Sequence, residues 1–228
     1  MLRREFLKGM GTGICTLVLG SPAFAAETEE PKPKETVPKI PIYLTIDDGP
    51  TQDMDNILKI LGTEHKVTFF LVGKLLENPW QYARARTALE LGHQLANHSY
   101  SHPFFSNIPL AKSREQILKT EEILQRLYQE TNRPFVKLFR FPYGDNGYFG
   151  SKDGKYHGSY QQRKELAGLL TELGYTSYLW DAVDGSHRNL KPNSVVLTHD
   201  RISGLGTYVA DYFIRSGKYE LKALPITD

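Results

Sequence analysis

From Ile40 to the C-terminus, short apolar segments alternate with longer segments whose apolar residues recur at helical spacing. Short apolar runs bounded by glycine, proline or polar residues are typical of buried strands, and the longer periodic segments are typical of helices. The predicted strands are Ile40–Ile46, Val67–Val72, His93–Asn97, Phe135–Phe141, Tyr175–Trp180, Val195–Thr198 and Tyr219–Leu224. The predicted helices cover residues 53–61, with Asp53 as the cap, 80–91, 109–129, 161–173 and 207–215. Seven parallel strands alternating with helices predict an α/β fold, a distorted (β/α)7 barrel that is either closed or incomplete.

The first 25 residues have a different character. Arg3 and Arg4 form a twin-arginine pattern, a mildly apolar stretch follows, and Ala23-Phe24-Ala25 is a small-x-small cleavage site. We therefore predict an export signal of twin-arginine type over residues 1–25, with a general secretory signal or a short membrane anchor as the alternatives. The apolar stretch is shorter than the roughly 20 residues that a good spanning helix needs. Because Cys15 is the only cysteine, the mature protein would have no thiol.

Residues 26–39 are rich in proline and in charges of both signs, which predicts a spacer rather than a helix or a central strand. Residues 40–228 have the length of one globular domain. The formal net charge is only +2, and lysine and arginine are spread along the chain. This pattern argues against nucleic acid as a partner.

Two adjacent carboxylates, Asp47 and Asp48, follow the first predicted strand. Neighbouring acids at a strand end repel each other unless a cation, or a division into base and ligand, holds them there. His98 and His102 follow the third predicted strand, and Pro103 disfavours a helix beyond them. Two imidazoles and one carboxylate form a site that leaves coordination positions open for water. Considered alone, two histidines at this spacing are more often surface or core residues.

Further polar residues follow other predicted strands. Arg140 lies at the end of the fourth strand and Tyr143 follows it, and His199 follows the sixth. Because the carboxyl ends of parallel strands hold the active site of a barrel, we expect these side chains to meet there. Considered alone, Arg140 fits a surface ion pair, His199 a hydrogen-bonded strand end and Tyr143 simple packing. The histidines without such support are left as structural or solvent-exposed: His93, His157 and His187.

In this order the motifs resemble those of the polysaccharide deacetylases, also called the NodB-homology domain or carbohydrate esterase family four. The family's T-F-D-D-G-P appears at residues 45–50 with isoleucine in place of phenylalanine, H-S/T-x-x-H at 98–102, R-x-P-Y at 140–143 and L-x-H at 197–199. The resemblance covers nearly all of the chain from Ile40 onward. Since the motifs occur together and in the family's order, functional roles become the better interpretation for Arg140, Tyr143 and His199.

The resemblance implies that Asp48, His98 and His102 bind a divalent metal, zinc first and cobalt as the alternative. It implies that Asp47 is the general base, because the metal acidifies and holds water while the adjacent acid takes its proton. Arg140 would orient Asp47 and keep it ionised.

The remaining roles concern the substrate. The backbone N–H of Tyr143 would stabilise the oxyanion that forms on the acetamide carbonyl, and His199 would donate a proton to the leaving amine. Tyr143 and Leu197 would also contact the substrate.

The fourth motif departs from the family pattern. Family members commonly have D-x-x-D-W, whose aspartate tunes the catalytic histidine and whose tryptophan walls the pocket. Here Trp180 precedes the two acids, Asp181 and Asp184, and no tryptophan follows them. We expect Asp184 to contact His199, with Asp181 as the second candidate. Trp180, or an aromatic residue of the long loop that follows Tyr143, would replace the missing aromatic wall, unless Trp180 belongs to the core. The glycine- and aromatic-rich loop 144–158 is either a substrate contact or a connector.

The implied function of residues 40–228 is metal-dependent hydrolysis of N-acetyl groups from an amino-sugar polymer or oligomer, with release of acetate. Peptidoglycan is the first candidate substrate, and chitin-like N-acetylglucosamine chains are the second. The alternatives are an O-acetyl esterase acting on xylan or another acetylated polysaccharide, and a catalytically idle carbohydrate-binding domain. With its signal, the protein would be periplasmic or secreted and would have no stable membrane span after cleavage.

Overall fold

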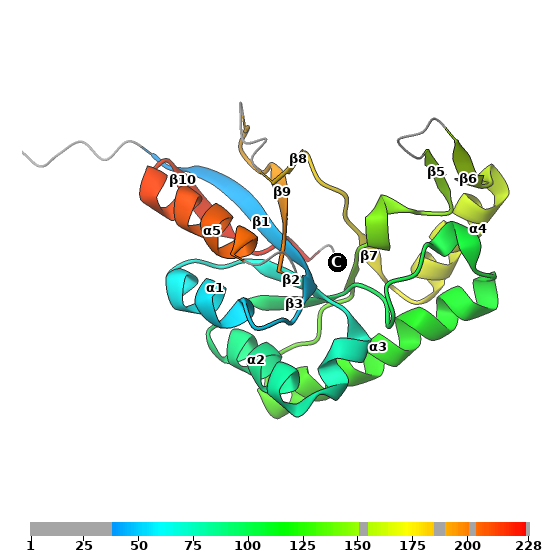
Figure 1. Ribbon diagram of the computed structural model, residues 1–228, viewed down its shortest axis with the longest axis horizontal. Helices are drawn as coiled ribbons and strands as arrows, with labels where there is room; N and C mark the ends of the chain where they lie inside the picture. The colour runs from blue at the N-terminus through cyan, green and yellow to red at the C-terminus, as the bar shows by residue number, and fades with distance from the viewer. Residues whose placement is uncertain (1–37, 151–154, 185–189, 201–203, 227–228) are drawn as a thin grey trace, which may run out of the picture. The chain divides into compact units, whose positions relative to one another are not determined.

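β1, Ile40–Gly49, is the central strand of an eight-stranded parallel sheet in the computed structural model, which describes residues 38–150, 155–184, 190–200 and 204–226 (Figure 1). β9 pairs with one edge of β1, while β10 and β2 pair with the first and second halves of the other edge. The predicted export signal at 1–25 and most of the spacer at 26–39 lie outside the described residues, so both stay predictions.

The other strands extend the sheet in the order β7-β4-β3-β2-β1-β9-β8. Their bounds are β2 Thr68–Leu71, β3 Gln94–Asn97, β4 Leu138–Phe139, β7 Thr176–Ser177, β8 Ala182–Val183, β9 Val195–His199 and β10 Tyr219–Lys222. Within the described residues β7 and β8 do not pair with each other. The predicted α/β barrel is therefore confirmed in its incomplete form.

The five predicted helices are present and end within a few residues of the expected positions. Their bounds are α1 Met54–Leu61, α2 Pro79–Glu90, α3 Leu110–Glu130, α4 Tyr160–Glu172 and α5 Leu205–Ser216. Asn78 caps α2 by accepting hydrogen bonds from the Trp80 and Gln81 N–H groups, and Ser159 caps α4. The expected side-chain cap by Asp53 is wrong, because the Asp53 carboxylate instead accepts from the Gly204 N–H at 2.6 Å.

Two predicted strands are much shorter than expected. The fourth is reduced to Leu138–Phe139 and the fifth to Thr176–Ser177. Directly after Ser177, the carbonyl groups of Tyr178 and Leu179 accept hydrogen bonds from the Arg140 guanidinium. A buried side chain therefore binds these carbonyl groups where the pattern predicts further strand.

The structure also contains elements that the patterns did not predict. These are β8, a hairpin of β5 Tyr148–Gly150 and β6 Tyr156–Gly158, and the short 3-10 helices η1 Gly73–Glu77, η2 Phe105–Asn107 and η3 Pro142–Gly144. The hairpin lies within the glycine- and aromatic-rich loop.

The core explains the composition of β1. Ile42, Leu44 and Ile46 are fully buried, and so is Thr45 on the opposite face of the strand. A parallel strand covered on both faces reads as a nearly continuous apolar run, as this one does. Among the described residues, no helix has the length and apolar character that crossing a membrane would need.

Candidate active site

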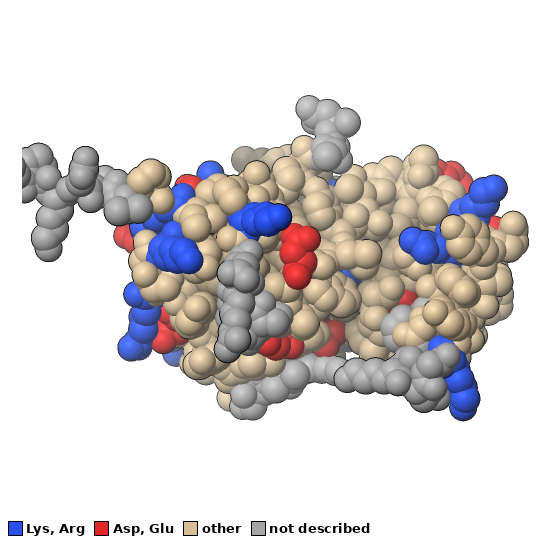
Figure 2. Space-filling model, turned by 90° about the horizontal axis from the view of Figure 1, so that it is seen from above, with Lys and Arg blue, Asp and Glu red and all other residues tan. Residues whose placement is uncertain are grey.

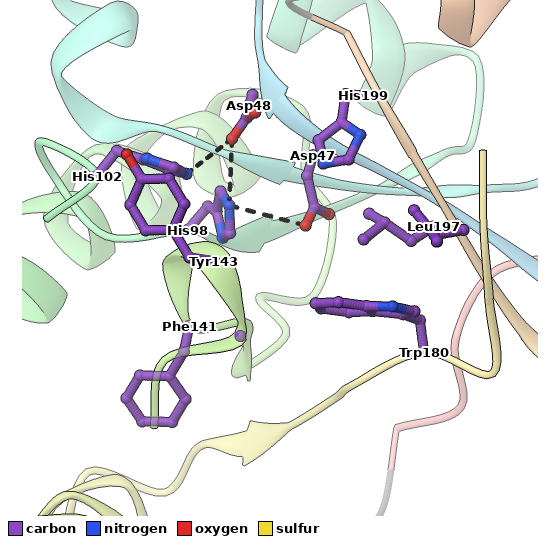
Figure 3. Close-up of a pocket in the computed structure, with 11 residues that line it drawn as sticks. Asp47, Asp48, His98, His102, Phe141, Tyr143, Trp180, Leu197 and His199 are labelled. Carbon is purple, nitrogen blue, oxygen red and sulfur yellow. Dashed lines mark ion pairs between the residues drawn. The ribbon is translucent and has the colours of Figure 1, made fainter. Parts of the chain in front are cut away.

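Several strand ends meet at one edge of the sheet and form a small pocket (Figure 3). Asp47 is in register with His199 of β9 and with Phe70 of β2, and β3 ends immediately before His98. Parallel pairing therefore brings together polar residues that are up to 152 positions apart in the sequence (His199 − Asp47 = 152). The pocket has a volume of about 160 Å³.

Asp48, His98 and His102 form a compact cluster of three metal-ligating side chains. One candidate ligand atom from each lies within 4.8 Å of the others. Asp48 Oδ1 is 2.9 Å from His102 Nε2 and 3.4 Å from His98 Nε2. The other ring nitrogen of His98, Nδ1, lies 2.8 Å from the backbone carbonyl oxygen of Arg140. A neutral His98 that donates from Nδ1 keeps a lone pair on Nε2, as metal ligation requires.

The electrostatics of the cluster fit a cation. Burial alone would raise the pKa of the Asp48 carboxyl, but hydrogen bonds and charges from His102 and His98 outweigh burial and lower the pKa far below its usual range. Asp48 is therefore ionised, the form in which carboxylates bind metals. Two imidazole nitrogens and one carboxylate oxygen are donors that suit zinc and other borderline divalent ions.

The backbone around the cluster is unusual. Asp48, Ser99, His102 and Tyr143 all have positive φ angles, between 57° and 69°. Non-glycine residues rarely adopt this left-handed conformation, and such strain concentrates at functional sites. Local hydrogen bonds hold the histidine turn in this conformation, since the His102 N–H donates to Ser99 Oγ at 3.1 Å. A hydrogen bond within the turn thus helps to hold His102 in a conformation that it would rarely adopt by itself.

Arg140 is completely buried beside Asp47. One guanidinium nitrogen donates to Asp47 Oδ1 at 2.8 Å and to Thr45 Oγ1 at 2.7 Å. The guanidinium also lies over the ring of Phe70, 4.2 Å from its centroid. The second oxygen of Asp47, Oδ2, lies 3.7 Å from His98 Nε2. Arg140 therefore holds one carboxylate oxygen of Asp47 and leaves the other directed toward the histidine cluster.

His199 and Asp184 form a second polar pair at the pocket. His199 Nδ1 lies 3.0 Å from Asp184 Oδ2, and both side chains are partly exposed. The second candidate, Asp181, binds elsewhere, because its carboxylate accepts from the Val195 N–H at 2.8 Å. The contact with His199 thus belongs to Asp184.

The pocket has two sides (Figure 3). His102 and Tyr143 line one side, and their rings meet edge to face with centroids 4.5 Å apart. Trp180, Leu197 and His199 line the other side. Trp180 is partly exposed rather than buried in the core, so it occupies the wall position that we expected of an aromatic residue.

The prediction missed several residues around the pocket. Val183 and Phe141 line it, and Phe104 stacks on Tyr143 with ring centroids 3.9 Å apart. Asp200 is fully buried behind the site, where its carboxylate accepts from the Thr51 N–H at 2.6 Å. In the sequence, only their positions next to the motifs pointed to these residues. Val183 lies between the two acids of the altered motif, Phe104 follows the histidines, and Asp200 follows His199.

Comparison with known proteins agrees with the motifs. Residues 34–153 match the family model described as polysaccharide deacetylase. A chitooligosaccharide deacetylase from Azorhizobium caulinodans is 30% identical over 175 residues, which cover 70% of this chain and 73% of that protein. A peptidoglycan-N-acetylglucosamine deacetylase from Bacillus cereus is 41% identical over 111 residues, which cover 47% of this chain and 38% of that protein.

The fold is also similar to that of a solved structure. The crystal structure of a peptidoglycan N-acetylglucosamine deacetylase superposes with a TM-score of 0.65 at 27% identity, over 82% of this chain and 87% of that one. The chain spans less than half of the length of several of the curated relatives that it matches. The family model covers Asp47, Asp48, His98, His102 and Tyr143 of the pocket, and it ends before Trp180 and His199.

Proposed function

This chain belongs to the polysaccharide deacetylase family, and from that premise we propose that it hydrolyses the N-acetyl groups of an amino-sugar polymer or oligomer and releases acetate. Peptidoglycan is the first candidate substrate and chitin-like N-acetylglucosamine chains are the second, as the activities of the Bacillus cereus and Azorhizobium caulinodans relatives suggest. One observation carries the proposal. Asp47 has one oxygen bound by Arg140, while the other is directed toward the cluster of Asp48, His98 and His102.

Asp48, His98 and His102 would hold a divalent ion, with zinc as the first candidate and cobalt as the second. The donor set, its mutual distances and the fixed ring orientation of His98 support this assignment. When bound, such an ion supplies Lewis acidity to the attacking water and to the acetyl carbonyl group.

Asp47 acts as the general base through Oδ2. The oxygen of a water molecule forms a bond to the carbonyl carbon of the acetamide, and Asp47 accepts a proton from that water. The buried Arg140 guanidinium keeps the carboxylate in one orientation because it binds Oδ1 and Thr45 together. A base held this way needs no rearrangement at the moment of attack.

The carbonyl oxygen becomes negatively charged as the water attacks. The backbone N–H of Tyr143 would donate to it. The carbon–nitrogen bond then breaks, and His199 gives a proton to the departing nitrogen, which leaves as a free amine. Asp184 holds His199 by its Nδ1 atom, so that Nε2 is left for the substrate.

The size of the pocket fits an acetyl group rather than a whole sugar. Pockets that enclose drug-sized ligands have volumes of about 300–1,000 Å³, and this one has about 160 Å³. Leu197, Val183 and Trp180 give it an apolar wall against which the acetyl methyl group can pack. The sugar ring and its neighbours would therefore lie outside the pocket.

The test is an acetate-release assay on peptidoglycan, chitooligosaccharides and acetyl-xylan, with zinc and cobalt added in turn. We expect release from the amino sugars that is lost with Asp47→Asn and with a chelator. Asp181→Asn is the matched control, because an asparagine oxygen can still accept the Val195 N–H. Full activity after chelation and dialysis would overturn the metal assignment. Release from acetyl-xylan alone would identify an O-acetyl esterase, and saccharide binding without any release would identify an idle binding domain.

We also propose that the protein is exported to the periplasm or beyond by its twin-arginine signal. The pattern at Arg3 and Arg4 and the site at 23–25 support this proposal. Replacement of both arginines by lysine should leave the precursor in the cytoplasm, as fractionation would show. Undiminished export of that variant would refute a twin-arginine route.

A further inference from the structure

Three exposed tyrosines gather on and beside the β5–β6 hairpin, and we call them the tyrosine platform: Tyr148, Tyr156 and Tyr160. Tyr156 is 69% exposed and Tyr160 is 74% exposed. The rings of Tyr148 and Tyr156 stack at a centroid distance of 5.2 Å and an angle of 15°, and Tyr160 lies 5.9 Å from Tyr148. Isolated exposed aromatics are ordinary, but a contiguous exposed group marks an interaction site.

Glycines on the hairpin allow the tyrosine rings to lie over the backbone. Tyr148 pairs with Gly158 across the hairpin, and Tyr156 pairs with Gly150. Residues paired in this way point to the same face of a hairpin, so both tyrosines and both glycines share one face. A Cβ atom at Gly150 would lie only 3.2 Å from the Tyr156 ring. The face is therefore a pair of stacked rings over bare backbone.

The base of the hairpin is anchored next to the pocket. The Asp145 carboxylate accepts hydrogen bonds from the N–H and the hydroxyl of Ser106, at 2.8 and 2.7 Å, and from the Gly147 N–H at 3.1 Å. Ser106 lies two positions after Phe104, whose ring stacks on Tyr143 at the rim of the pocket. A continuous set of contacts thus connects the pocket rim to the tyrosine platform.

The tyrosine platform lies at one end of the upper side of the molecule, where lysine and arginine side chains also occur (Figures 1 and 2). Figure 1 shows β5–β6 and β8 along the same upper side of the molecule. Figure 2 shows that side from above, with lysine and arginine gathered toward its ends, one of which carries the β5–β6 hairpin, and mostly uncharged surface between the ends. Exposed aromatic rings of this kind suit a ligand that has flat apolar faces.

We infer that the tyrosine platform binds sugar rings of the polymer substrate that lie beyond the acetyl pocket, an inference that rests on the proposed function. In the proposed mechanism the small pocket takes only the acetyl group, so the neighbouring sugars need surface contacts elsewhere. The faces of a pyranose ring carry C–H groups of slightly positive charge, which pack on the negative faces of aromatic rings while the hydroxyl groups stay in water. Stacking on Tyr156 and Tyr160 needs no new hydrogen bond from the protein.

The test compares acetate release from N-acetylglucosamine oligomers of increasing length. Variants are Tyr156→Ala, Tyr160→Ala, their combination, and Tyr156→Phe, which keeps the ring. Tyr208→Ala is the matched control, because Tyr208 is 63% exposed on α5, away from the hairpin. We expect each alanine to raise KM for the longest oligomer about threefold to tenfold and to leave kcat unchanged. For the shortest oligomer that is turned over, every variant should keep the wild-type KM. Tyr156→Phe and Tyr208→Ala should keep the wild-type KM for the longest oligomer as well.

Two results would overturn the inference. One is an unchanged KM for long oligomers in the combined alanine variant, and the other is an equal loss for short and long oligomers, which would indicate a structural effect. If the wild-type protein releases no acetate at all, the proposed function fails and sedimentation with insoluble peptidoglycan and with chitin decides about the platform. Loss of sedimentation in the combined variant but not in Tyr208→Ala supports the platform. Equal sedimentation of all variants, or no sedimentation of the wild type, overturns it.

Discussion

Two histidines flank β3 and are almost equally buried, yet their surroundings are opposite. His93 precedes the strand and is 1% exposed, and His98 follows it and is 2% exposed. Both ring nitrogens of His98 face polar partners, the Arg140 carbonyl oxygen and Asp48. In the described part of the chain, neither ring nitrogen of His93 has a hydrogen-bond partner.

The difference teaches that burial alone does not make a histidine functional. At the carboxyl end of the sheet, His98 meets acids from β1 and an arginine that follows β4, as expected for the active-site edge of parallel strands. At the amino end, His93 packs edge to face on Phe69, with ring centroids 5.7 Å apart. Burial, together with the charges of Lys66 and Arg133, lowers the pKa of His93 to about 4. His93 is therefore a neutral core residue near pH 7, and each end of β3 can be tested by substitution.

The largest effect should come from breaking the buried pair at the carboxyl end. Arg140→Met leaves the Asp47 carboxylate buried without its guanidinium, and removal of one partner of such a pair costs about 3–5 kcal/mol. Urea unfolding of the apo protein should show this loss.

A control and a second variant identify the cause. Arg86→Met removes an exposed pair with Glu90 and should change the free energy of unfolding by less than about 1 kcal/mol. If the unpaired charge is the cause, Asp47→Asn combined with Arg140→Met should recover part of the loss. Equal costs for Arg140→Met and Arg86→Met would contradict our assignment of Arg140.

A direct comparison of the two histidines should give the next largest effect. His98→Leu removes a proposed metal ligand, and we expect zinc affinity and kcat/KM to fall by more than about 100-fold, since even residues that support ligands cost 10–100-fold. His93→Leu is the matched change at the other end of β3 and should leave both quantities at the wild-type level. Zinc titration and acetate release would measure them. Loss of zinc affinity in His93→Leu as well would show that the two ends are not independent.

Much of the active-site end could be predicted because its signals are local. The apolar run before Asp47 and the four-residue spacing of His98 and His102 can be read within short windows of sequence. The parallel sheet then brings the strand ends together, so prediction of the strands also indicated which residues meet.

Other features could not be predicted because they depend on contacts between distant residues. The strand that starts at Tyr175 ends early because Arg140 binds the carbonyl groups of Tyr178 and Leu179. The Asp53 carboxylate binds the Gly204 N–H, 151 positions away, instead of capping α1. The state of His93 was also left open, since nothing near it in the sequence indicates that both ring nitrogens lack partners.

Substitutions in the exposed part of the active-site end should reduce activity less than substitutions in its buried part. Asp184→Asn removes the charge beside His199 Nδ1, and we expect kcat for acetate release to fall about 10–100-fold with little change in KM. Asp181→Asn should match the wild type, because its contact with the Val195 N–H needs only an oxygen acceptor. If kcat fell more in Asp181→Asn than in Asp184→Asn, our assignment of the supporting role to Asp184 would be wrong.

The smallest effect should appear at the amino end of β3, in the pH dependence of stability. Because the pKa of His93 is about 4 in the folded protein and about 6.5 in an unfolded chain, the unfolded state binds more protons between these values. The contribution of neutral His93 to the free energy of unfolding is therefore complete above pH 6.5. It falls as the pH decreases toward 4, by about 1 kcal/mol between pH 7 and pH 5.5. His93→Leu should remove this component, so urea unfolding at the two pH values should show a flatter dependence than in the wild type. His157→Leu, at an exposed histidine, should keep the wild-type slope, and an unchanged slope in His93→Leu would mean that His93 is not held neutral by burial.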